Sequence, residues 1–148
     1  MFYILLSIIT IYLLFSIIKY KQIPESISDT FYLGNKWWFT FTMVVLGFLV
    51  CAILIPITSE LYQFTAFLTG AGLLLVGATP HIKDMSERKV HFGGALIFGL
   101  MSQIWASLYC SPWLLLTWIF LIPLWKTKQR IFWMEFICII NIILAYLI

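Results

Sequence analysis

Charged residues are scarce in this sequence. Of its 148 residues only 10% are Asp, Glu, Lys or Arg, whereas 63% are hydrophobic. A soluble domain usually carries about 25% charged residues and roughly 45–50% apolar ones. A chain of this length cannot bury so large an apolar surface in an aqueous core, because small domains bury proportionally less of their surface. The composition therefore excludes an ordinary soluble domain and indicates an integral membrane protein whose apolar side chains face lipid.

Cysteine motifs and the marks of a cleaved leader are also missing. The three cysteines, Cys51, Cys110 and Cys138, form no CxxC pair and lie within or beside apolar runs. We interpret them as small buried apolar residues rather than as a disulfide framework or a redox motif.

The first apolar run has no basic residue before it, and Lys19 and Lys21 follow it directly. This pattern is typical of a retained membrane anchor rather than of a signal peptide.

Long apolar segments dominate what the sequence does contain. A membrane-crossing helix needs about 20 apolar residues, with a lower limit near 17. Six runs can be marked, at residues 2–18, 37–57, 61–79, 91–110, 112–125 and 131–148. The fifth run is short and could instead be a re-entrant segment that does not cross the membrane. In that case the two ends of the chain would lie on opposite sides of the membrane. The pattern predicts an all-α transmembrane bundle of about six helices, forming a single domain over residues 1–148.

The basic residues are confined to alternate loops of this bundle. Lys19, Lys21 and Lys36 lie between the first and second runs. Lys83, Arg88 and Lys89 lie between the third and fourth, and Lys126, Lys128 and Arg130 lie between the fifth and sixth. The other two connections are short and contain no basic residue. Since Lys and Arg are enriched in cytoplasmic loops, these loops are predicted to be cytoplasmic and both termini to lie outside. The expected location is the inner (plasma) membrane of the cell.

The first basic loop carries a helical pattern of its own. Pro24 suits a first helical turn, and Gly34 suits a helix end. Ile27 and Phe31 are four residues apart, so a helix here would have one apolar face. We predict a short helix near residues 24–33, lying in the membrane interface or tucked under the bundle.

Small residues form stripes along two consecutive runs. The stripes consist of Ala66, Gly70 and Gly77 in the third run and of Ala95, Gly99, Ser102 and Ala106 in the fourth. Small residues let helices approach closely within a membrane, so these two helices are predicted to pack along the stripes. His91 lies one turn before Ala95 on the same stripe and is therefore expected to point into the bundle.

Polar residues gather near His91 at the predicted cytoplasmic edge. His81 and Asp84 follow the third run, and Asp29 lies in the first loop on the same side. Two histidines and a carboxylate suit a catalytic zinc ion, which typically takes three protein ligands and a water. In this hypothesis His91 and His81 bind the metal. Asp84 or Asp29 supplies the third ligand or the general base. Ser102 would donate a hydrogen bond to an oxyanion.

The same residues also have a structural interpretation. Interfacial His, Asp and Ser residues commonly cap helices or pair with nearby Lys and Arg. His91 could hydrogen-bond across the helix seam, and Asp84 could pair with Lys83 or Arg88. No HxxxH or ExxH spacing fixes a metal site in this sequence, so both interpretations stay open.

Two resemblances bear on the choice. The segments PESISDTFY (24–32), GAGLLLVGATPHIK (70–83) and KVHFGGA (89–95) resemble a family of uncharacterised small multi-pass membrane proteins of bacteria and phages. More distantly, a glycine-rich helix that ends near a proline, an acidic loop and a His that opens the next helix are similar to the alkaline ceramidase and adiponectin-receptor-like membrane hydrolases. That resemblance implies a zinc-dependent amidase acting on lipid, with His91, Ser102 and Asp29 as the matching residues.

Three functions follow as alternatives. A metal-dependent lipid hydrolase would bring His91 and Asp29 within metal-binding distance of each other. A non-catalytic scaffold, assembly or lipid-binding protein would leave them apart, with membrane lipids, further copies of the chain or other membrane proteins as partners, and no nucleic acid. A transporter would need a polar path across the membrane. The interiors of the predicted helices carry almost nothing polar beyond Gln103, Thr117 and Asn141. Glu135 lies near the end of the sixth run and is expected to reach back to the interface.

Overall fold

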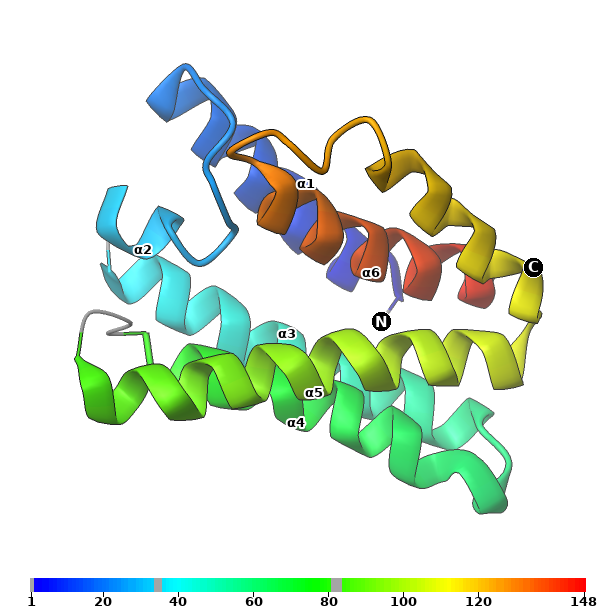
Figure 1. The fold of residues 1–148 in the computed structure, drawn as a ribbon. Helices are drawn as coiled ribbons and strands as arrows, with labels where there is room; N and C mark the ends of the chain where they lie inside the picture. Colours follow the sequence, from blue (N-terminus) through cyan, green and yellow to red (C-terminus); the bar gives the residue numbers. More distant parts are fainter. Residues whose placement is uncertain (1, 34–35, 81–83) are drawn as a thin grey trace.

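The computed structural model describes residues 2–33, 36–80 and 84–148, and its described residues form an all-α bundle (Figure 1). The helices are, in chain order, α1 (Phe2–Tyr20), α2 (Thr30–Leu33), α3 (Lys36–Ile57), η1 (Glu60–Tyr62), α4 (Gln63–Ala78), α5 (Met85–Tyr109), η2 (Pro112–Leu121) and α6 (Arg130–Leu147). The elements η1 and η2 are 3-10 helices.

The long helices are arranged in two layers. Helix α4 lies between α3 and α5 and packs closely on both, which makes one layer of three helices. Helices α1 and α6 make the second layer, where α1 packs on α3 and α6 packs on α5 and η2. The candidate functional site lies between these two layers.

Within the described residues, five helices are long and apolar enough to cross a membrane, namely α1, α3, α4 together with η1, α5 and α6. The predicted apolar run 112–125 does not form a sixth helix of that kind. It forms η2, a 3-10 helix of ten residues, about 20 Å long at 2.0 Å per residue, whereas the hydrocarbon core is about 30 Å thick. Pro123 lies just beyond η2, and its missing amide hydrogen opposes a longer helix there.

Helices α5 and α6 nevertheless run in the same direction. The Cys138 thiol contacts the Gly99 carbonyl oxygen at 3.9 Å, and further along both helices Asn141 donates to Gln103. Residue numbers thus rise together along the two helices. The segment between them must return the chain along the length of the bundle (Figure 1).

The two ends of the described chain lie together. The ring of Phe2 at the start of α1 stacks on the ring of Tyr146 near the end of α6, with centroids 3.9 Å apart. At the other end of the bundle, the Phe132 amide at the start of α6 donates to the Glu25 carbonyl oxygen at 3.0 Å, just after α1. Helices α1 and α6 are therefore antiparallel, and the loop that follows α1 bonds to the start of α6.

The predicted packing of the small-residue stripes was wrong in its partners. A Cβ atom built on Gly70 would lie 2.7 Å from the carbonyl oxygen of Gly47, and one on Gly77 would lie 3.0 Å from the Met43 Cβ. Both glycines of the stripe thus face α3 and not α5. Since α4 is the middle helix of its layer, it needs small residues on two faces, and spacing alone does not identify which neighbour each face meets.

A different pair of glycines makes the close contact between α4 and α5. A Cβ on Gly72 would lie 2.7 Å from the Gly94 carbonyl oxygen, and a Cβ on Gly94 would lie 2.9 Å from the Gly72 carbonyl oxygen. On α5 the predicted stripe turns toward α6 instead, where Gly99 contacts Cys138.

The first loop is tucked under the bundle, but its helix is shorter than predicted. Helix α2 covers only Thr30–Leu33, and the preceding residues form turns. Ile27 and Phe31 are buried, as their spacing indicated. Residues 26–30 form tighter turns in which the Asp29 amide donates to the Ser26 carbonyl oxygen and the Thr30 amide to that of Ile27, and the Glu25 carbonyl and the Ile27 amide attach this segment to α6. The predicted helix end at Gly34 lies outside the described residues.

Candidate functional site

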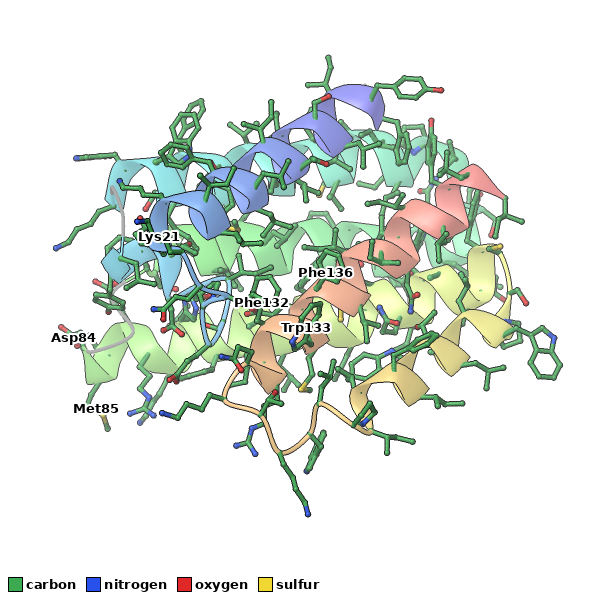
Figure 2. The ribbon with its side chains drawn as sticks, turned by 90° about the horizontal axis from the view of Figure 1, so that it is seen from above. Lys21, Asp84, Met85, Phe132, Trp133 and Phe136 are labelled. Atoms are coloured by element: carbon green, nitrogen blue, oxygen red, sulfur yellow. The ribbon has the colours of Figure 1, made fainter. Side chains whose placement is uncertain are left out.

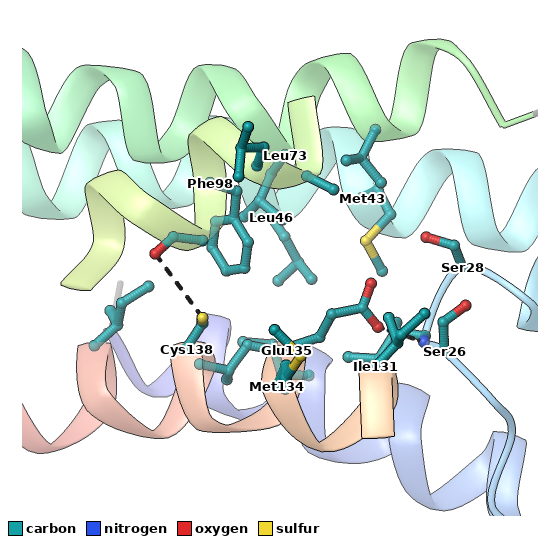
Figure 3. A pocket seen from close by; sticks show the side chains of 18 of the residues that line it. Ser26, Ser28, Met43, Leu46, Leu73, Phe98, Ile131, Met134, Glu135 and Cys138 are labelled. Atoms are coloured by element: carbon teal, nitrogen blue, oxygen red, sulfur yellow. Dashed lines mark hydrogen bonds between the residues drawn. The ribbon is translucent and has the colours of Figure 1, made fainter. Parts of the chain in front are cut away.

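A cavity of about 700 Å³ lies between the two helix layers. Ligand pockets in proteins usually have volumes of about 300–1,000 Å³, so this space is large enough for a small molecule or a lipid chain. Its walls come from α1, the first loop, α3, α4, α5, η2 and α6. Most of the side chains that line it are apolar, including Leu46, Leu73 and Phe98 (Figure 3).

The polar groups of the pocket are concentrated at one end. Most of them lie where the first loop meets the starts of α5 and α6, namely Glu25, Ser26, Ser28, Asp29, His91 and Glu135, together with Tyr12, which bonds to Thr30 of that loop. Gln103 lines the pocket further along α5. Of the residues that the structure describes, no Lys or Arg lines the pocket. The pocket is therefore amphipathic along its length, with acidic groups at the loop end and walls beyond that are apolar except for Gln103.

Glu135 is the functional candidate that sequence reasoning missed. It lies about 7.5 Å inside α6, five residues after the first helical position, and its carboxylate points into the pocket beside Ser26 and Ser28 (Figure 3). Its Oε2 accepts a hydrogen bond of 2.6 Å from the Ile27 amide. The expected reach to the interface does not occur, because the first loop folds over this end of α6. A sequence signal existed, since an acidic residue within an apolar run is itself unusual.

His91 lies inside the bundle, as its place on the α5 stripe predicted, and it is buried. Its Nδ1 lies 2.8 Å from the Thr79 carbonyl oxygen and its Nε2 lies 2.9 Å from the Ser28 hydroxyl. A carbonyl oxygen only accepts, so Nδ1 donates, and in the neutral ring Nε2 accepts from the hydroxyl. His91 thus joins the end of α4, the start of α5 and the first loop, and both of its ring nitrogens are engaged.

The predicted metal ligands are not brought together in the described part of the chain. Asp84 is exposed and caps α5, accepting from the amide of Ser86 at 2.9 Å and from its hydroxyl at 2.7 Å. His81 lies outside the described residues. Among those described, no group of three or more His, Cys, Asp and Glu residues could hold a metal ion. The zinc site with His91, His81 and Asp84 stays a prediction that no described contact supports.

The two predicted catalytic residues lie in different places. Asp29 lines the acidic end of the pocket, in the same loop as Ser28. Ser102 is fully buried and lies about 16 Å along α5 from His91, at 1.5 Å per residue. Its hydroxyl donates to the Gly99 carbonyl oxygen at 2.9 Å and accepts from the Gln103 amide at 3.1 Å. Ser102 is therefore part of a separate network and not of the acidic end of the pocket.

That network joins α5, η2 and α6 through buried polar groups. The Gln103 Oε1 accepts from the Trp118 indole at 2.9 Å and from the Asn141 amide at 2.6 Å. The Asn141 Oδ1 accepts from the Thr117 hydroxyl at 3.0 Å. The polar residues noted within the predicted helices thus satisfy one another and attach the short return segment to the bundle, and of these residues Gln103 also lines the pocket.

No family model matches the chain, and neither a curated protein nor a solved structure resembles it at a significant level. The resemblances drawn from its motifs stay predictions.

Proposed function

We propose that this chain is a multi-pass membrane protein that binds a membrane lipid in the pocket between its two helix layers. The pocket's volume of about 700 Å³ and its apolar walls suit an acyl chain. Because a lipid chain is already in an apolar medium in the bilayer, the walls supply shape and packing rather than a hydrophobic driving force. The polar end of the pocket must then make binding there preferable to a place in the bilayer.

The carboxylate of Glu135 is the observation that carries this proposal. Ionisable groups inside membrane helices are costly and are commonly found where the protein binds or moves something. Glu135 points into the pocket and takes a hydrogen bond from a backbone amide. Within the described residues no Lys or Arg forms an ion pair with it, and its charged neighbour is another carboxylate, Asp29. A group of that kind is stabilised when a bound molecule supplies a donor. We do not propose a hydrolase, because the described residues assemble no metal-ligand set.

The proposal includes a topology of six crossings with both termini outside the plasma membrane. The parallel course of α5 and α6 supports it, because the chain must cross back between them. The stacked rings of Phe2 and Tyr146 bring the two ends of the described chain together, which supports both ends lying on one side. Figure 2 places Lys21, Asp84 and Met85 together at the opposite end of the bundle. That end carries the basic loops and is the cytoplasmic end in this proposal.

Cysteine labelling tests this topology. In a background in which the three native cysteines are replaced by serine, single cysteines are introduced at the exposed positions Ser59, Met85 and Ile148. In intact cells a membrane-impermeant maleimide is expected to label Ser59→Cys and Ile148→Cys but not Met85→Cys, and all three after lysis. Labelling of Met85→Cys in intact cells, or protection of Ile148→Cys, would contradict the six-crossing arrangement.

A pocket-filling substitution tests the lipid binding. Ala95 lines the pocket on α5, whereas Ile104 on the same helix is 41% exposed and is not a lining residue. Ala95→Phe is expected to lower the amount of lipid that copurifies in mild detergent several-fold, as measured by mass spectrometry of organic extracts. Ile104→Phe adds a ring on the lipid-facing side and is expected to retain lipid. Both variants are compared only if they elute as single monodisperse species.

A further inference from the structure

We infer that the lipid in this pocket carries a positively charged ammonium in its head group, placed against Glu135. This inference rests on the proposed lipid binding and adds the chemical class of the ligand. It follows from the charges at the polar end of the pocket. Three carboxylates line that end, from Glu25, Asp29 and Glu135, and no Lys or Arg of the described residues lines it, while both ring nitrogens of His91 are engaged by Thr79 and Ser28. A cationic head group complements this end, whereas a fatty-acid carboxylate or a bare phosphate would be repelled.

The contacts around Glu135 leave room for such a head group. One carboxylate oxygen accepts from the Ile27 amide, which leaves further acceptor capacity on the carboxylate. The buried side chains of Ser26 and Ser28 lie at the same end of the pocket (Figure 3). An ammonium has up to three N–H donors, and charge-assisted hydrogen bonds are stronger than neutral ones. The ammonium thus satisfies a carboxylate that the described protein side chains leave without a cation.

The polarity of the pocket sets the direction of the bound molecule. With the head at the Glu135 end, the chain extends between the layers toward Leu5 and Ile142, which line the pocket nearer the two termini. This is the orientation of a lipid in the leaflet on the side of the basic loops. The ligand therefore need not invert in order to bind.

The pocket also reaches the lipid-facing surface of the bundle. Phe92, Leu96 and Leu100 follow one another at every fourth residue of α5 and so lie on one helix face. They line the pocket and are 50%, 62% and 52% exposed. On α6, Ile131 lines the pocket and is 44% exposed. An amphiphile can thus enter sideways from the bilayer between the starts of these two helices, without passing through water.

The test compares three amphiphiles that share one chain and differ in the head group. Hexadecylamine, hexadecanol and palmitate are titrated separately into the full-length protein in a non-ionic detergent, and bound species are counted by native mass spectrometry. The wild type is expected to bind the amine at least about ten-fold more tightly than the fatty acid, with the alcohol between them. Glu135→Gln is expected to lose about ten-fold in amine affinity while binding of the alcohol changes little. Glu60→Gln, which removes an exposed carboxylate at the opposite end of the bundle, is the matched control.

The outcomes separate this inference from the proposed function. Palmitate binding as tightly as the amine in the wild type, or an amine preference that survives in Glu135→Gln, overturns the head-group assignment and leaves lipid binding in place. Failure of all three amphiphiles to bind the wild type overturns both. The comparison of the three amphiphiles on the wild type can overturn the inference by itself. The test therefore stands even if the Glu135→Gln protein folds poorly.

Discussion

Gly94→Ala is expected to destabilise the bundle strongly, whereas Gly93→Ala at the next position is expected to be neutral or stabilising. A Cβ on Gly94 would lie 2.7 Å from the Leu75 Cβ and 2.9 Å from the Gly72 carbonyl oxygen, so α4 and α5 would have to move apart. Forcing an extra carbon into a packed contact costs about 1–3 kcal/mol. A Cβ on Gly93 meets nothing within 4 Å, and alanine is the better helix former by up to about 1 kcal/mol.

The pair is compared by thermal unfolding in detergent, followed by the loss of the monodisperse peak in size-exclusion chromatography. Both variants add the same methyl group to the same helix, so the difference between their midpoints isolates the contact with α4. Equal midpoints for the two variants would mean that α4 and α5 do not approach each other at these glycines.

Asn141→Ala is expected to be the second strongly destabilising change. Asn141 is fully buried, donates to Gln103 and to the Leu114 carbonyl oxygen, and accepts from Thr117. Its loss leaves these groups without one of their partners, and a buried polar group without a partner costs about 1–3 kcal/mol. Hydrogen bonds between membrane helices average only about 0.6 kcal/mol. We therefore expect each unpartnered group to cost an amount in the lower half of the range of about 1–3 kcal/mol. Because several groups lose a partner at once, their costs add to a large loss of stability.

The unfolding midpoint of Asn141→Ala is compared with those of two other variants, Thr117→Val and Leu147→Ala. Thr117→Val removes one bond of the network and is expected to lower the unfolding midpoint by less than Asn141→Ala does. Leu147 is 60% exposed, so its truncation is expected to change little. An Asn141→Ala protein as stable as Leu147→Ala would show that the network does not hold η2 against α5 and α6.

The positions of the long helices were predictable because lipid imposes a simple rule on sequence. A crossing helix must be apolar over most of its length, and the predicted run 37–57 matches α3 to within one residue. The start of α5 was placed too late, at His91 rather than Met85, because its first turn is charged and is begun by the Asp84 cap. Hydropathy does not register that turn as helix, although capping does.

The identity of each helix's neighbours was not predictable in the same way. The spacing of Gly70 and Gly77 correctly indicated a close approach, but it did not indicate whether α3 or α5 makes it. The run 112–125 was apolar enough for a helix, yet Pro123 and the hydrogen bonds of Thr117 and Trp118 to α6 and α5 give a shorter, tighter segment. Pro123 is a local signal, but the choice of neighbour for each face of α4 and the bonds of Thr117 and Trp118 are tertiary contacts that the local sequence does not encode.

The candidate site was predicted in part. His91 was correctly expected to point inward, because the face of a helix can be inferred from its periodicity. The importance of Glu135 was missed, since its environment depends on the first loop, which is more than one hundred residues away in the chain and donates the Ile27 amide. The pocket itself results from how two helix layers pack, and no sequence pattern specifies it.

The measurement that tests the central claim most directly is the lipid content of the purified protein, with wild type and Ala95→Phe prepared side by side. The account predicts close to one tightly held lipid per wild-type chain after extended detergent washing, and much less in Ala95→Phe at equal protein stability. Lipid that washes out of the wild type, or that is retained equally by both proteins, would contradict it, because it would then come from the outer surface of the helices and not from the pocket.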